Sequence, residues 1–156
     1  MNNLEKLTRY ILQKYPDVSE LSKPRLVKLI YLIDWRYTIE NGHQYTNIKW
    51  VYNHYGPYVN DVINLMKSKH EVFNVRSFQN SLGGISDKFE LINRDEIILE
   101  NNIKRIADQF IDYTFKLNWS DFINLVYSSF PIKSNIKYNY LDLVELAKEF
   151  NNKNFR

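Results

Sequence analysis

The residue best placed to do chemistry is Asp34, an acidic side chain in the middle of a predicted helix. At about 100° per residue it falls between two apolar stripes of that helix, so we expect it to be buried. A buried carboxylate needs hydrogen-bonding partners, because otherwise it becomes protonated. Two roles are open: a general base in a pocket, or a structural acceptor that ties the helix to a loop backbone.

A small hydrolytic enzyme would need a second group beside Asp34. A tyrosine is one candidate, and His54 is another if the turn at residues 52–58 folds back onto the helix. No other residue pattern supplies a catalytic partner. We therefore favour the structural role for Asp34 and predict a protein that is not an enzyme and has no catalytic residues.

Other site chemistries are not supported by the residue types. His43, His54 and His70 have no metal-ligand spacing, and the chain has no cysteine, so no metal site is expected. The sequence lacks a phosphate-binding glycine loop, a nucleophile elbow and a dinucleotide fingerprint. We predict no cofactor.

Basic residues give only a weak signal for nucleic acid. The net charge is +3, and it is spread along the chain. Arg25, Lys28 and Arg36 share one face of the predicted helix and are able to contact phosphate. Such a face is more often simply solvated, so we do not expect nucleic-acid binding.

Aromatic residues are concentrated between Tyr31 and Tyr58. This stretch holds eight of the 24 aromatic residues (12 Tyr, 9 Phe and 3 Trp). Tyr and Trp dominate binding hot spots, because each combines a large stiff apolar body with a polar tip. Most of the eight are expected in the core, with two or three facing outward or lining a groove. The partner-binding candidates are Tyr31, Trp35, Trp50, Tyr52, Tyr55 and Tyr58.

A central helix over residues 23–40 must position these groups. Ser22 is a suitable N-cap, Pro24 falls in the first turn, and Gly42 follows as a stop. Two apolar stripes run along the helix, one with Leu26, Leu29, Ile30, Ile33 and Tyr37 and one with Val27, Tyr31 and Trp35. A helix with two apolar sides is expected to pack on both.

Apolar spacing predicts five more helices and a small antiparallel sheet. The helices are expected near residues 3–14, 57–69, 103–111, 120–131 and 141–150, with Pro57 opening the second, Ser120 capping the fourth and Pro131 ending it. Residues 72–78 and 88–92 read as a β-hairpin, 48–52 as a short strand, and 96–99 as a candidate third strand. The fold class is α+β: about six helices around helix 23–40, with a small hairpin.

The composition fits one domain over residues 1–156, with 44% apolar and 25% charged residues and only four Gly and four Pro. The polar tail 151–156 is expected to be frayed. The first residues lack the apolar segment of a signal peptide, and no apolar run approaches the roughly 18 residues of a membrane span. We therefore expect a cytoplasmic protein with no membrane partner.

Three segments together resemble the Panacea antitoxin domain, also called SocA-like. LSKPRLVKLIYLIDW at residues 21–35 is similar to the opening helix of that family, and IKWVYNHYGPY at 48–58 to its aromatic strand before Gly-Pro. Residues 120–131 resemble its last helix, which ends in proline. The positions that match the family motifs are Lys28, Leu29, Tyr31, Trp35, Trp50, Tyr55, Gly56 and Pro57. We expect Lys28, Asp34, Gly56 and Pro57 to serve the structure of these motifs.

The resemblance implies a mainly helical fold with a small sheet, and a function in a toxin–antitoxin system. The partner would be a cognate toxin protein, which the antitoxin binds and neutralises. Some members of the family act as adaptors that deliver the bound toxin to an ATP-dependent protease, which is the alternative reading. The family is often found in prophages and other mobile elements.

Overall fold

The computed structural model describes residues 1–154 of the 156-residue chain. Over this range the chain forms seven α-helices, a short 3-10 helix and two antiparallel sheets of two strands each. The helices are α1 (Asn3–Lys14), η1 (Val18–Glu20), α2 (Lys23–Asn41), α3 (Asp61–Ser68), α4 (Asn101–Thr114), α5 (Trp119–Tyr127), α6 (Phe130–Lys133) and α7 (Leu143–Asn154). The strands are β1 (Tyr52–Asn53), β2 (Gly56–Pro57), β3 (Phe73–Gln79) and β4 (Ile85–Leu91). The predicted class, α+β and mainly helical, is confirmed.

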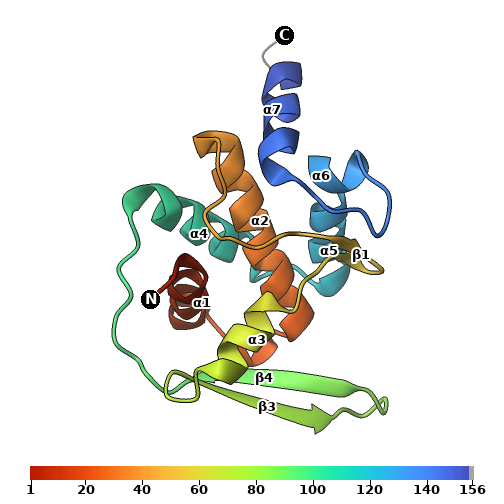
Figure 1. Ribbon diagram of the computed structural model, residues 1–156. Coiled ribbons are helices and arrows are strands. Elements are labelled where there is room, and N and C mark those ends of the chain that lie inside the picture. The colour runs from red at the N-terminus through yellow and green to blue at the C-terminus, as the bar shows by residue number, and fades with distance from the viewer. Residues whose placement is uncertain (155–156) are drawn as a thin grey trace.

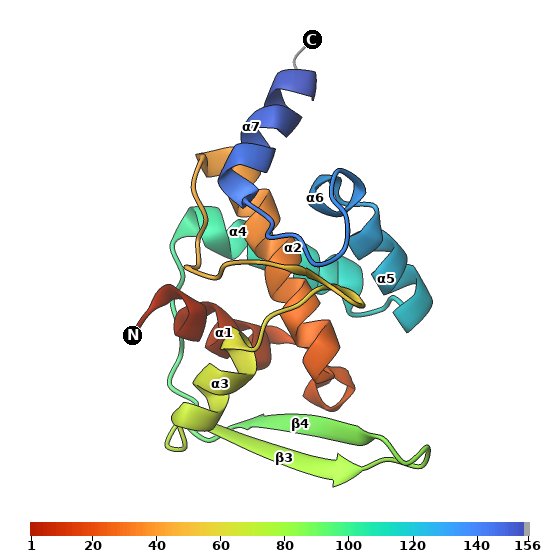
Figure 2. The same cartoon turned by 45° about the vertical axis from the view of Figure 1, so that its right-hand side comes forward.

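Helix α2 is the centre of the fold, as the sequence predicted. It runs through the middle of the molecule, and the other helices lie around it (Figures 1 and 2). Helices α4 and α7 and strand β4 pack against it. Thirteen of its 19 residues are buried, so both apolar stripes face protein.

The ends of α2 follow the local signals in the sequence. The Ser22 side chain accepts a hydrogen bond from the Arg25 N–H at 3.3 Å, and Pro24 lies in the first turn. Gly42 ends the helix in the left-handed region, at φ 79°, and its N–H donates to the Thr38 carbonyl at 2.9 Å. Both predicted ends are confirmed.

The basic face expected on α2 is not a solvated patch. Arg25 is buried and donates to the carbonyls of Thr114 and Leu117 at 2.6 and 2.7 Å. Lys28 is 1% exposed. Arg36 alone is exposed, and it pairs with Glu40. The prediction was wrong because elements distant in sequence cover the first half of this face.

The aromatic segment after α2 differs from the prediction. Residues 48–50 lie outside the strands, and the short hairpin β1–β2 pairs Tyr52 with Pro57 and Asn53 with Gly56. Pro57 therefore belongs to a strand and does not open a helix, and α3 begins only at Asp61. This segment also pairs with a distant part of the chain, because Trp50 and Tyr52 make backbone hydrogen bonds with residues 138–141.

The second hairpin, β3–β4, is confirmed close to its predicted ranges, with Phe73 opposite Leu91 and Gln79 opposite Ile85. Residues 96–99 form no strand, so the candidate third strand was wrong. The buried side chains of Ile97 and Leu99 explain the alternating pattern there, because they pack into the core without strand pairing.

Two predicted helix ends near the C-terminus were also displaced. Asn118 caps α5 in place of Ser120, because its side chain accepts the Asp121 N–H at 2.8 Å. Pro131 lies in the first turn of α6, after α5 has already ended at Tyr127. Helix α7 continues through Asn154, so most of the tail predicted to be frayed is helical, and residues 155–156 lie outside the described residues.

Candidate functional site

Asp34 is a structural acceptor at the centre of the aromatic segment. Its side chain is 0% exposed and accepts five hydrogen bonds from the loop that follows α2. Oδ1 accepts from the backbone N–H groups of Tyr45 and Thr46 at 3.0 and 3.1 Å. Oδ2 accepts from the Thr46 hydroxyl at 2.5 Å, and also from the Gln44 amide and the Trp50 indole. This bonding pattern is the one that a structural acceptor would make.

The electrostatics of Asp34 agree with a role in holding the fold. Burial raises the pKa of Asp34, and the hydrogen bonds from Thr46, Trp50 and Tyr45 oppose that rise by stabilising the carboxylate. All of these donors belong to a single loop. The carboxylate therefore fixes the path of residues 44–50 across α2.

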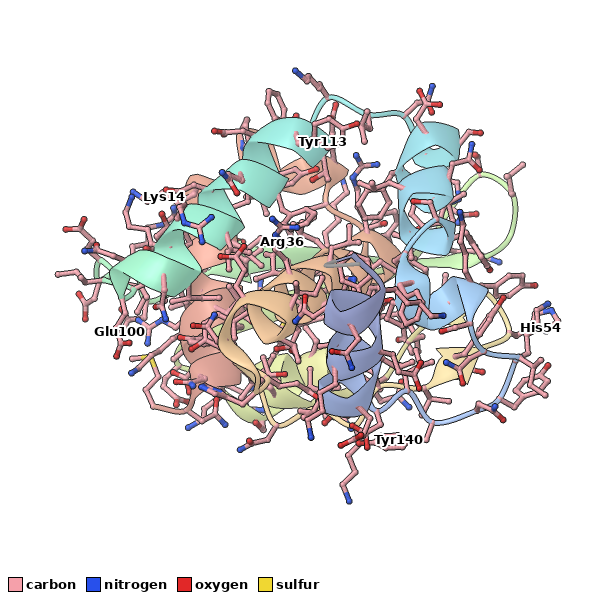
Figure 3. All side chains as sticks on the ribbon, turned by 90° about the horizontal axis from the view of Figure 1, so that it is seen from above. Lys14, Arg36, His54, Glu100, Tyr113 and Tyr140 are labelled. Atoms are coloured by element: carbon pink, nitrogen blue, oxygen red, sulfur yellow. The ribbon has the colours of Figure 1, made fainter. Side chains whose placement is uncertain are left out.

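The structure does not bring Asp34 and His54 together. Asp34 is sealed from solvent, whereas His54 is exposed at the edge of the molecule beside the β1–β2 hairpin (Figure 3). The His54 Nδ1 lies 3.1 Å from the Tyr138 hydroxyl, within hydrogen-bond distance. The pairing of Asp34 with His54 that the enzyme alternative would use is therefore not formed in this structure.

Three of the six partner-binding candidates lie in the core. Tyr31 and Trp50 are 0% exposed, and their rings meet edge to face at a centroid distance of 5.5 Å. Trp35 is also buried and stacks on Phe130 at 6.4 Å. These three side chains shape the scaffold and have no surface that a partner can reach in this structure.

The other three candidates reach the surface around the first hairpin. Tyr55 is 75% exposed, while Tyr52 and Tyr58 are partly buried. Tyr138, a residue that the sequence analysis missed, is 67% exposed and contacts His54. The side chains of Tyr52, His54, Tyr55, Tyr58 and Tyr138 are called the hairpin surface below. The only local signal for Tyr138 was the tyrosine-rich run at residues 138–140.

A pocket of about 310 Å³ opens beside the hairpin surface. One wall comes from the first turns of α2, with Lys23, Pro24 and Lys28. The other wall comes from the hairpin and the residue after it. It consists of Asn53, His54, Tyr55 and Tyr58. These seven residues define what is called the Lys28 pocket below.

Gly56 allows the hairpin to lie close to Lys28, which lines the pocket. Its φ of +100° lies in the region that favours glycine. A Cβ at this position would lie 3.6 Å from the Lys28 Cε and 3.5 Å from the Tyr127 ring. Pro57, the other motif residue of the turn, is buried in β2. Gly56 and Pro57 thus lie in the hairpin backbone, where the sequence analysis expected a structural role for them.

Other chemistries have no counterpart in the described residues. Within residues 1–154, no group of three His, Cys, Asp or Glu side chains is placed to hold a metal ion. None of the helices in that range is long and apolar enough to cross a membrane.

Comparison with known proteins gives one match. The family described as antitoxin SocA-like, Panacea domain, matches residues 26–131, which is more than half of the chain. The matched range begins in α2 and ends in α6, so it includes Asp34, its loop and the hairpin β1–β2. Neither a curated protein nor a solved structure matches the chain at a significant level.

Proposed function

Because this chain belongs to the antitoxin SocA-like, Panacea domain family, we propose that it is an antitoxin that binds and neutralises a cognate toxin protein. The family description gives an antitoxin role, and the proposal adds that this chain contacts the toxin directly. We further propose that the protein acts by binding and not by catalysis, as a single domain. The prediction from the sequence and the family match point to the same function.

The observation that carries the proposal is the hairpin surface. Exposed tyrosines gather at the β1–β2 hairpin, where Tyr55 is 75% and Tyr138 67% exposed. Tyrosine rings contribute strongly to protein interfaces, because they bury a large area while losing little side-chain freedom. Beneath them, the buried pair Tyr31–Trp50 and the Asp34 bonds hold the hairpin in place. A fixed backbone lowers the entropy lost on binding.

Co-expression tests the proposal. The gene next to that of this chain is expressed alone and together with it, and growth is followed. We expect the neighbouring product alone to stop growth and this chain to restore it through a complex that co-purifies. A neighbour that is harmless alone, or growth restored with no complex formed, would contradict the proposal.

The same cultures distinguish neutralisation from delivery to a protease. Direct neutralisation predicts that the toxin persists at an unchanged level, bound to this chain. An adaptor would instead make the toxin level fall, and a strain lacking ATP-dependent proteases would then lose the protection. Immunoblotting of the tagged toxin after synthesis is stopped measures this level directly.

A further inference from the structure

Lys28 is a buried cation without a counter-ion. It is 1% exposed, yet among the described residues its ammonium makes no hydrogen bond and no ion pair. Its ammonium lies over the Tyr58 ring, with Nζ 5.7 Å from the ring centroid. A cation over an aromatic ring gains only a modest attraction, which does not replace the lost hydration of an ammonium.

The ammonium of Lys28 keeps its opening to solvent through the pocket. Within residues 1–154, the only side-chain nitrogen or oxygen that is both fully buried and without a hydrogen bond is Arg9 Nε. Lys28 Nζ has no hydrogen bond either, so it must keep some contact with solvent. The Lys28 pocket is the space that this residue lines. A group that enters the pocket can therefore reach Lys28.

Burial changes the titration of Lys28. Removal from water lowers its pKa to about 8, because the low-polarity surroundings disfavour the charged form. The ammonium is thus mostly protonated at neutral pH. The titratable groups around it are Lys23 on α2, His54, Tyr55 and Tyr58 at the hairpin, and Tyr127 on α5, and none of these is a carboxylate.

Lys28 is the cation of the pocket that has no acidic partner. Lys23, the second cation of the wall, is already neutralised by Asp87 at 3.4 Å. The first turn of the 19-residue helix α2 also belongs to the wall, and the positive end of the helix dipole adds to the same sign. A toxin bound over Tyr55 and Tyr58 would remove water from the pocket, which would strengthen a charge pair formed there.

We propose that the Lys28 pocket receives one acidic side chain, Asp or Glu, of the toxin, whose carboxylate becomes the counter-ion of Lys28. This proposal rests on the proposed function and gives it a specific anchor. A protein side chain fits better than a free anion, because Tyr55 forms both the pocket wall and the hairpin surface. A toxin bound across that surface would place side chains directly over the opening. The volume, about 310 Å³, is at the small end of ligand sites and suits a single side chain.

Lys28→Met is the decisive variant, because methionine keeps the length of the side chain and removes its charge. Binding of the purified product of the neighbouring gene is measured by calorimetry at pH 7. We expect the affinity to fall roughly 30-fold or more, since the acidic side chain is then buried without a partner. Lys67→Met, at an exposed lysine on α3 outside the pocket, should bind like the original chain.

The acidic partner is found by replacing each surface Asp and Glu of the toxin with Asn or Gln. One of these changes should reproduce the loss seen with Lys28→Met, and the two together should lose little more than either alone. Unchanged affinity of Lys28→Met, or additive losses with every acidic replacement, would overturn the proposal. If the original chain itself does not bind the neighbouring product, the proposed function fails instead.

Side-chain NMR of Lys28 gives an independent test that needs no variant. In the free protein the Lys28 ammonium should titrate near pH 8, and in the complex its pKa should rise by at least one unit, because a carboxylate now stabilises the charge. Binding should accordingly weaken as the pH rises from 8 to 10. A Lys28 pKa that is the same in the free and bound proteins would also overturn the proposal.

Discussion

The indole Nε1 of Trp50 donates a hydrogen bond to Oδ2 of Asp34 over 2.9 Å, with both side chains fully buried. This bond joins the middle of α2 to the segment that leads into the β1–β2 hairpin. It is one of five bonds to the same carboxylate, so a single acidic side chain fixes much of the loop that leads to the hairpin. Trp50 then places its ring edge to face against Tyr31.

Replacing Asp34 with alanine should unfold much of this arrangement. The change leaves four donors, on Tyr45, Thr46 and Trp50, without their acceptor, whereas the Gln44 amide keeps its bonds to the carbonyls of Thr46 and Ile48. We expect a loss of about 3–5 kcal/mol in the free energy of unfolding. Urea denaturation followed by tryptophan fluorescence measures it. Asp121→Ala, at an exposed position in the first turn of α5, should cost less than about 1 kcal/mol. Equal losses for the two variants would contradict the structural role of Asp34.

Trp50→Ala and Tyr55→Ala should have opposite effects on folding and binding. Trp50 is 0% and Tyr55 75% exposed. Trp50→Ala opens a cavity and removes a buried hydrogen bond, so it should cost about 3–5 kcal/mol of stability. Tyr55→Ala should change stability by no more than about 0.5 kcal/mol and weaken toxin binding by about 2 kcal/mol.

The control for Tyr55 is Tyr113 on α4, a tyrosine that is 55% exposed and lies far from His54 (Figure 3). Tyr113→Ala should neutralise the toxin like the original chain in a growth assay. If Tyr113→Ala loses neutralisation and Tyr55→Ala keeps it, the binding face is on α4 and the assignment to the hairpin surface is wrong.

The sequence predicted best the features that depend on neighbouring residues. Ser22, Pro24 and Gly42 define the ends of α2 through contacts within four residues, and the burial of Asp34 follows from its place between two apolar stripes. The structural role of Asp34 could be predicted for that reason. The identity of its donors could not, because they lie on a loop without regular structure.

The errors arise where distant segments meet. Tyr52 donates its N–H to the Asn139 carbonyl at 2.9 Å, and the Leu141 N–H donates to the Trp50 carbonyl at 2.8 Å. No local pattern at residues 48–52 contains these partners, so the strand was placed too early. Lys28 was expected on a solvated face for the same reason. A helical wheel describes one helix, whereas Gly56 and Tyr58 of another segment cover this lysine.

Gly56→Ala tests how the hairpin approaches α2. An added Cβ would make only ordinary contacts, at 3.5–3.6 Å, so the cost comes from the backbone at φ +100°. We expect a loss of about 1–3 kcal/mol in the free energy of unfolding. Amide hydrogen exchange should also become faster at Tyr58, whose N–H donates to Val51. Gly84→Ala, at a glycine without positive φ, is the control and should cost less stability than Gly56→Ala. If amide exchange at Tyr58 is unchanged in Gly56→Ala, the backbone at Gly56 does not hold the hairpin in place.

Lys28→Met should make the free protein more stable. In the original chain the folded state holds Lys28 at a pKa of about 8, while the unfolded state has the ordinary value of 10.5. Below pH 8 the folded state therefore carries the full penalty of a buried charge, which corresponds to about 3 kcal/mol. Methionine of similar length has no such penalty. Thermal or urea unfolding at pH 7 should show a gain of about 1–3 kcal/mol, whereas a lysine with a hidden structural partner would give a loss.

The pH dependence provides the control for this explanation. Between pH 8 and 10 the unfolded chain binds a proton at Lys28 that the folded chain has released, so the stability of the original protein should rise with pH. The rise relative to Lys28→Met should total about 2 kcal/mol over this interval. Burial raises the pKa values of Tyr10, Tyr31 and Tyr45. Their contribution to the free energy of unfolding is therefore lost only above about pH 10, and the loss is the same in both proteins. A constant difference between the two proteins from pH 7 to 10 would show that Lys28 does not titrate in this range, and its burial would then not be the source of the stability change.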